Sequence, residues 1–142
     1  MNSDDPMVTR RGAQPRIAHI GIAVADRDRI LPFYRDLLGM AEEPLDDADG
    51  ARIAGLRAGE SLVELLEAKA PDTPIGKFVS KRGPGIHHIC FAVDDLNATL
   101  DRCRRAGVRL IDDTPRIGAE GKRIAFLHPS STGGVLVELT EA

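Results

Sequence analysis

The stretch 85-GIHHICFAVDDL-96 places two adjacent histidines at the start of an apolar run, and a similar stretch, 16-RIAHIGIAVADR-27, lies near the other end of the chain. In both stretches the hydrophobic side chains alternate in the way that is typical of a half-buried strand. Each run ends at an aspartate, Asp26 or Asp95, in the N-cap position of a following helix. A strand followed by a helix therefore occurs twice.

Each half of the chain continues with the same order of elements. The first helix has an apolar stripe and ends at Gly39, and the second has its own stripe and ends at Gly107. The stripes consist of Ile30, Phe33, Tyr34, Leu37 and Leu38 in the first helix and of Leu96, Leu100 and Cys103 in the second. Strands are expected near 40–45 and within 51–56 and 61–67 in the first half, and within 108–113, 123–128 and 134–141 in the second.

These repeats predict an α+β fold of two tandem βαβββ modules that form a curved mixed sheet around a metal-binding cleft. Module one covers about 16–68, a linker helix about 73–82, and module two about 85–141. Together they form a single domain over 16–142. Residues 1–15 lack periodicity and are expected to form a disordered tail.

The repeat distinguishes between the two adjacent histidines. Aligning the two stretches without a gap places His19 opposite His88, not His87. Because side chains alternate across a strand, His19 and His88 lie on the face with the smaller neighbours, away from the bulky residues that pack against a helix. We therefore expect both to point into a concave cleft, and His87 to be packed or hydrogen-bonded on the other face.

The last strand of each module carries a glutamate in an equivalent place. Glu64 lies between Val63 and Leu65, and Glu138 lies between Val137 and Leu139. Carboxylates buried in a cleft need compensation, and a divalent cation can hold two of them beside two imidazoles. Nitrogen and oxygen donors suit Co, Mn, Ni, Fe or Zn, and four protein ligands leave two positions open on a six-coordinate ion.

Composition and charge exclude several other classes. The chain has 142 residues and a formal net charge of −3, and its basic residues are spread among acidic ones. It therefore lacks the positive field that attracts nucleic acid or a membrane surface. Cys90 and Cys103 are interpreted as buried free thiols, and the absence of an apolar leader or span predicts a cytoplasmic protein.

Four segments resemble the vicinal oxygen chelate superfamily and, within it, the methylmalonyl-CoA epimerase family. They are HIGIAV at 19–24, ELLEA at 64–68, TPIGKFVSKRGPGIHHICFAVDDL at 73–96 and LIDDTPRIGAEGKRIAFLHPSSTGGVLVEL at 110–139. The resemblance covers nearly all of 16–141. It implies a metal held by His19, Glu64, His88 and Glu138, with cobalt first and Mn, Ni, Zn, Fe or Mg as alternatives.

The resemblance also implies a reaction and partners. The substrate is a small acyl-CoA, in propionate metabolism, whose C2 proton is removed to give an enolate and returned on the other face. Glu138 is the implied base, and a homodimer is the implied assembly. Six basic residues could meet the CoA phosphates: Lys77, Lys81, Arg82, Arg116, Lys122 and Arg123.

The chain departs from part of this family at three positions. Ile53 stands where some members have a second glutamate, so the second acid/base is left unassigned, with water and Glu64 as candidates. Glu120 replaces a common histidine and Ser130 a common lysine, which affects the expected loop contacts. Two other functions remain open: a lyase of the glyoxalase I kind acting on a hemithioacetal, and a metal-free small-molecule-binding module of the same fold.

Overall fold

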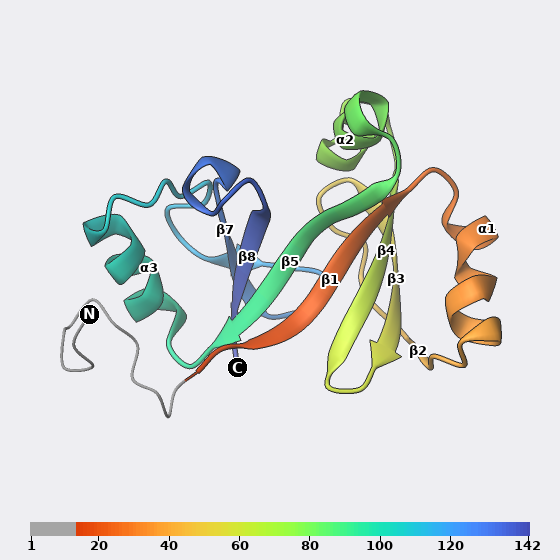
Figure 1. Ribbon diagram of the computed structural model, residues 1–142, viewed down its shortest axis with the longest axis horizontal. Helices are drawn as coiled ribbons and strands as arrows, with labels where there is room; N and C mark the ends of the chain where they lie inside the picture. Colours follow the sequence, from red (N-terminus) through yellow and green to blue (C-terminus); the bar gives the residue numbers. More distant parts are fainter. Residues whose placement is uncertain (1–13) are drawn as a thin grey trace.

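The computed structural model describes residues 14–142, and its eight strands form one curled mixed sheet (Figure 1). The strands are β1 (Arg16–Val24), β2 (Glu42–Glu43), β3 (Ala51–Ala58), β4 (Ser61–Ala68), β5 (Gly85–Val93), β6 (Arg116–Ile117), β7 (Arg123–Leu127) and β8 (Leu136–Glu141). The helices are α1 (Arg27–Pro32), the π-helix η2 (Phe33–Leu37), α2 (Pro74–Arg82), α3 (Leu96–Arg105) and the 3₁₀-helix η3 (Pro129–Ser131). The predicted fold class is confirmed.

The strand order, β2-β3-β4-β1-β5-β8-β7-β6, is symmetric about the antiparallel pair β1 and β5. β1 runs parallel to β4, and β5 runs parallel to β8. Gly21 is the register partner of Glu64 on β4, and Cys90 is the register partner of Glu138 on β8. Since Gly21 and Cys90 each follow a cleft histidine by two positions, the repeat extends to the register of individual residues.

The bulky faces of the strands pack against the helices, as the alternation predicts. In the first half, Leu31 of α1 packs with Leu56 and Leu65. In the second half, the α3 residues Leu96 and Leu100 belong to a matching cluster. Asp26 and Asp95 cap these helices by accepting the backbone N–H groups of Arg29 and Ala98. Because both helices cover the outer face, the inner face is left for the site.

Helix α2 closes one end of the inner face. Its Ile75 is buried in a cluster with Ala23, Ile53 and Leu66, which come from β1, β3 and β4. Thr73 caps this helix by accepting the N–H of Gly76, and Pro74 occupies its first turn. The predicted linker helix therefore contributes an apolar wall to the concave side of the sheet.

The first helix differs from the prediction. It ends as an α-helix at Pro32 and continues as η2, in which the N–H of Leu38 donates to the carbonyl of Phe33. Pro32 has no N–H for the α-helical ladder, and the wider π turn rotates the following residues. Leu31 is buried, whereas Phe33 and Leu37 are 49% and 78% exposed, so the predicted stripe is wrong as a packing face.

The strand expected within 108–113 is also wrong. That segment pairs with β7 through one isolated bridge, between Leu110 and Leu127, and the first strand after α3 is β6. Asp112 explains the difference, because its carboxylate accepts the N–H of Phe126 and an N–H of Arg116. A side chain thus takes the hydrogen bond of the Phe126 N–H, and the backbone ladder does not extend into a strand.

Three further expectations concern the N-terminal tail, membrane-spanning helices and the two cysteines. The tail expected over 1–15 lies outside the described residues, apart from 14 and 15. Among the described residues, no helix combines the length and the apolar character needed to cross a membrane. Cys90 and Cys103 are free thiols as predicted. Cys90 is fully buried, whereas Cys103 is only partly buried at the edge of the α3 cluster, so its predicted burial is wrong.

A glycine-to-alanine pair tests the close approach of β1 and β5. A Cβ at Gly21 would lie 2.2 Å from Cε1 of His88, whereas a Cβ at Gly85 meets nothing within 4 Å. We expect Gly21→Ala to lower the free energy of unfolding by about 1–3 kcal/mol through overpacking, and Gly85→Ala to leave it nearly unchanged. Urea unfolding measures both, and equal effects would contradict the register.

Candidate metal centre

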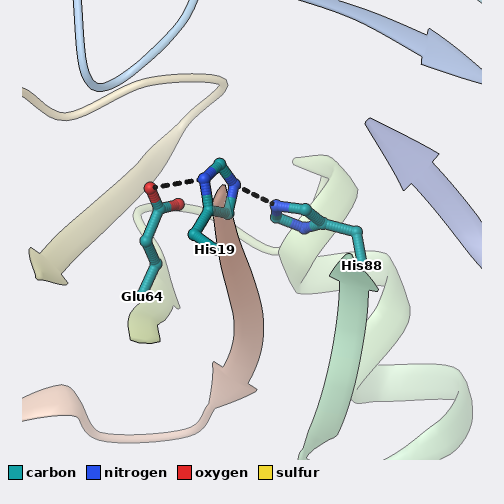
Figure 2. Close-up of side chains that lie close together, drawn as sticks. All are labelled: His19, Glu64 and His88. Carbon is teal, nitrogen blue, oxygen red and sulfur yellow. Dashed lines mark hydrogen bonds and ion pairs between the residues drawn. The ribbon is translucent and has the colours of Figure 1, made fainter. Parts of the chain in front are cut away.

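Four neighbouring strands bring two histidines and two glutamates to one place on the inner face. His19 comes from β1, Glu64 from β4, His88 from β5 and Glu138 from β8. Each is at most 4% exposed, although all four are polar. Figure 2 shows the imidazole of His19 between Glu64 and His88. The four residues selected by the sequence repeat therefore form one buried cluster.

Three donor atoms in this cluster lie in mutual contact. Nε2 of His19 lies 3.0 Å from Nε2 of His88 and 2.8 Å from Oε1 of Glu138. Nε2 of His88 lies 3.0 Å from the same Glu138 oxygen. Glu64 approaches from the other side, with Oε2 3.4 Å from Nδ1 of His19. That Glu64 oxygen is buried without a hydrogen-bond partner among the described residues.

The outer nitrogens of the two imidazoles have partners of their own. Nδ1 of His19 lies 2.7 Å from Oε2 of Glu120, and Nδ1 of His88 lies 2.9 Å from Nδ1 of His87. Burial lowers the pKa of His87 to about 4, so His87 is neutral and its Nδ1 can accept a hydrogen bond from the Nδ1–H of His88. Both cleft histidines are thus held at Nδ1 with Nε2 directed at each other.

Burial and hydrogen bonding shift the pKa values of Glu64 and Glu138 in opposite directions. Burial raises the pKa of Glu64 to about 8. Burial also opposes ionisation of Glu138, but hydrogen bonds from His19 and His88 outweigh it and lower the pKa to about 2. The pKa of His19 is raised, because hydrogen bonds to Cys90, Glu120 and Glu138 outweigh its burial. The cluster therefore favours positive charge at its centre.

These donors fit a divalent metal ion. Metal–nitrogen and metal–oxygen bonds of about 2.0–2.2 Å at right angles place neighbouring donor atoms about 3 Å apart. The separations among His19, His88 and Glu138 are 2.8–3.0 Å. Donor atoms of His19, Glu64 and His88 also lie within 4.8 Å of one another. The unpartnered oxygen of Glu64 is the group that a cation would satisfy.

A cavity of about 230 Å³ opens onto the cluster. Its walls are largely apolar and include Ile53, Leu66, Ile124 and Phe126. All four glutamate and histidine donors line it, together with His87 and Glu120. A small acyl group could thus reach the donors while its hydrocarbon part contacts the walls.

Sequence reasoning identified the four central residues but missed two others. His87 is half-buried and touches both His88 and Phe78, so it is packed and hydrogen-bonded as predicted. The prediction that it lies on the other face is wrong, because the register of β1 and β5 shifts between His88 and Ile86 and His87 lines the cavity. Glu120 was noted only as a departure in a loop, and the structure brings it to His19. The signal available in the sequence was a carboxylate between two glycines, which does not reveal where a loop turns.

The comparisons with known proteins agree with this geometry. Residues 18–126 match the Glyoxalase/Bleomycin resistance protein/Dioxygenase superfamily. The mitochondrial methylmalonyl-CoA epimerase of Mus musculus is 37% identical over 131 residues, which are 89% of this chain and 73% of the relative. The ethylmalonyl-CoA/methylmalonyl-CoA epimerase of Cereibacter sphaeroides is 38% identical over 89% of this chain and 97% of its own length.

Solved structures give the same result. The crystal structure of methylmalonyl-CoA epimerase from Mycobacterium tuberculosis superposes with a TM-score of 0.84 at 40% identity, covering 88% of this chain and 86% of that one. A methylmalonyl-CoA epimerase in complex with methylmalonyl-CoA and NH4+ superposes with a TM-score of 0.85 at 40% identity, covering 89% and 94%. The chain therefore belongs to the glyoxalase superfamily, on the branch of the methylmalonyl-CoA epimerases.

The raised pKa of Glu64 predicts how the metal-free protein responds to pH. Between the ordinary value of 4.5 and about 8, the folded protein holds a proton on Glu64 that the unfolded chain has released, so the free energy of unfolding falls as pH rises. His19, whose pKa is also raised, acts in the same direction above its ordinary value of 6.5. We expect the melting temperature of chelator-treated protein to fall between about pH 6.5 and 8.

Glu64→Gln separates the contribution of this carboxyl from the rest. Because glutamine does not titrate, the melting temperature of Glu64→Gln should fall less steeply over the same pH range. Glu60→Gln, which alters an exposed carboxylate in the β3–β4 turn, is the matched control and should follow the wild type. Parallel curves for all three proteins would contradict the raised pKa.

Proposed function

We propose that this chain is an epimerase that interconverts (2R)- and (2S)-methylmalonyl-CoA through removal and return of the C2 proton. The observation that carries the proposal is the buried set His19, Glu64, His88 and Glu138 beside an acyl-sized cavity, in a chain about 40% identical to methylmalonyl-CoA epimerases of known structure. The enzyme is thus an isomerase that acts on an acyl-CoA.

We propose that the four side chains hold one divalent transition-metal ion. Two imidazoles and two carboxylates are typical donors for Co, Mn, Ni, Zn or Fe, and less so for Mg, which prefers oxygen. We place cobalt first among them. When bound, the cation supplies positive charge that stabilises the enolate oxygens of the substrate more than the ground state.

Glu138 is the proposed base. Its carboxylate lines the cavity, and a bound cation would keep it ionised. The C–H bond at C2 breaks, the proton passes to Glu138, and the electron pair moves into the enolate. A proton returned to the opposite face of the planar carbon then gives the other epimer.

Epimerisation also needs a group that transfers a proton on the face of C2 opposite Glu138. Ile53, which lies on the β3 side of the cavity, is apolar and carries no proton to give. Glu64 lines the same cavity and carries a carboxyl group that can exchange a proton. Glu64 and a solvent molecule are therefore the two groups proposed for the second face.

A groove beside the cavity suits the CoA arm of the substrate. It shares Pro74, His87 and Leu136 with the cavity, so the two adjoin. Its other walls combine three cations of α2 with apolar side chains: Lys77, Lys81, Arg82, Phe78, Ile86, Ile89 and Val135. Among the described residues, these three cations form no ion pair with a carboxylate, so they are available to phosphates.

The homodimer and the cytoplasmic location stay predictions. The exposed apolar residues of the first helical segment support self-association, because Phe33, Leu37 and Leu38 are 49%, 78% and 58% exposed. Light scattering of the purified chain measures its mass in solution. The similarity to methylmalonyl-CoA epimerases supports a role in propionate metabolism, which also stays a prediction.

Solvent-deuterium exchange tests the proposed reaction. Cobalt-loaded protein should incorporate deuterium at C2 of methylmalonyl-CoA, as measured by mass spectrometry. Glu138→Gln should slow this exchange by at least about 100-fold, because the amide cannot accept the proton. Glu60→Gln provides the matched control and should exchange at the rate of the wild type.

The exchange experiment also distinguishes the other functions. Absence of exchange with every divalent metal tried would contradict the epimerase, and turnover of methylglyoxal with glutathione would then identify a glyoxalase I-type lyase. Protein that binds methylmalonyl-CoA without taking up metal would identify a binding module. Exchange with ethylmalonyl-CoA that is about 10–200-fold slower is compatible with the proposal, since one methylene changes binding by about 1–3 kcal/mol.

Charge removal in the groove tests where the CoA phosphates bind. We expect Lys77→Ala combined with Lys81→Ala to raise KM for methylmalonyl-CoA about tenfold, and to leave KM for methylmalonyl-pantetheine, which lacks the phosphates, unchanged. Arg29→Ala combined with Arg105→Ala removes two exposed charges elsewhere and is the control. Equal changes for both substrates would contradict phosphate binding in the groove.

A further inference from the structure

We propose that Glu120 is a positioning residue for the metal centre. Its carboxylate accepts a hydrogen bond from the Nδ1–H of His19 and thereby directs Nε2 of His19 at the metal. The inference rests on the proposed function, because it assigns a role in holding the proposed metal ion. It concerns a residue outside the four central donors. Glu120 lies on the turn between β6 and β7, far in sequence from the strand that carries His19.

The geometry at His19 divides its two nitrogens between two tasks. Nδ1 lies 2.7 Å from Oε2 of Glu120 and 3.4 Å from Oε2 of Glu64, so Glu120 is the nearer acceptor on that side. Nε2 lies 3.0 Å from Nε2 of His88 and 2.8 Å from Oε1 of Glu138. A neutral imidazole carries one ring proton. With that proton on Nδ1 and directed at Glu120, the lone pair of Nε2 faces the other donors, which is the form that binds a metal.

The turn that carries Glu120 is held on both sides. The N–H of Gly118 donates to the carbonyl of Lys122 at 2.9 Å, and the N–H of Gly121 donates to the carbonyl of Gly118 at 3.1 Å. Gly121 has φ +73°, a conformation that favours glycine. The N–H of Asp46, from the other module, donates to the carbonyl of Ala119 at 3.2 Å. The backbone thus fixes the residue whose carboxylate meets His19.

The charge of Glu120 suits this task. Its side chain is only 21% exposed, and its Oε2 lies 2.7 Å from Nδ1 of His19. A carboxylate behind a metal-binding imidazole fixes the ring orientation and increases the basicity of the coordinating nitrogen. Such partners typically change metal affinity by about 10–100-fold when they are removed.

His88 provides an internal comparison. Its Nδ1 lies 2.9 Å from Nδ1 of His87, so the second cleft histidine has an imidazole as its partner where the first has a carboxylate. The two modules therefore hold equivalent imidazoles by different means. This difference predicts that the first module makes the stronger nitrogen ligand.

Zinc affinity of the full chain tests the proposal. We expect Glu120→Ala to raise the Kd for Zn²⁺, measured by competition with a chromophoric chelator, by about 10–100-fold. Glu120→Gln keeps an oxygen that can accept from Nδ1 and loses the charge, so its Kd should lie between those of the wild type and Glu120→Ala. Glu60→Gln and Glu60→Ala are the matched controls and should bind zinc as the wild type does.

The protonation state of His19 gives a second readout that a merely structural role would not change. In nitrogen-15 spectra of the zinc-loaded protein, the ring proton of His19 should be on Nδ1 and exchange slowly with solvent. In Glu120→Ala the same proton should exchange rapidly. Zinc bound through Nδ1 of His19 in the wild type would overturn the proposal.

The outcomes separate this inference from the proposed function. Wild-type protein that takes up no divalent metal would overturn both. Wild-type protein that binds zinc and supports C2 exchange, with Glu120→Ala equal to it in Kd, would overturn the positioning role alone. Loss of affinity in Glu120→Ala with partial recovery in Glu120→Gln would establish it.

Discussion

Two buried carboxylates beside two imidazoles are the constraint on which this structure depends. Glu64 and Glu138 are 2% and 4% exposed, and an isolated carboxylate at such depth costs several kcal/mol. Hydrogen bonds from His19 and His88 compensate Glu138, whereas the inner oxygen of Glu64 has no partner among the described residues. A cation at the centre would balance both glutamates at once, and the walls of the cavity leave such a cation open to a small acyl group.

The sheet explains how the chain assembles this cluster from distant residues. Strands β1 and β5 lie side by side and antiparallel, and each has the last strand of its own module on its outer side. Each histidine is therefore separated from its glutamate by one strand spacing and two residues of register. The equivalent register positions in the two modules place all four side chains on the same inner face. Duplication of one module thus produces a centre that neither module contains alone.

Much of this arrangement could be predicted from the sequence, because it follows from alternation along strands. Local periodicity determines the face on which His19 and His88 lie and the equivalent positions of Glu64 and Glu138 in the two modules. It also places the helix caps Asp26 and Asp95. The π turn after Pro32, the replacement of a strand by contacts of Asp112, and the approach of Glu120 to His19 depend on tertiary contacts instead. A loop residue between two glycines carries no periodicity from which its direction could be deduced.

The most direct test of the central claim is the anomalous diffraction of cobalt-loaded crystals, with data collected on both sides of the cobalt absorption edge. We expect one strong anomalous peak per chain, within bonding distance of a nitrogen of His19, a nitrogen of His88 and an oxygen each of Glu64 and Glu138. A peak bound elsewhere, or crystals of cobalt-treated protein with no peak inside the cluster, would contradict the account.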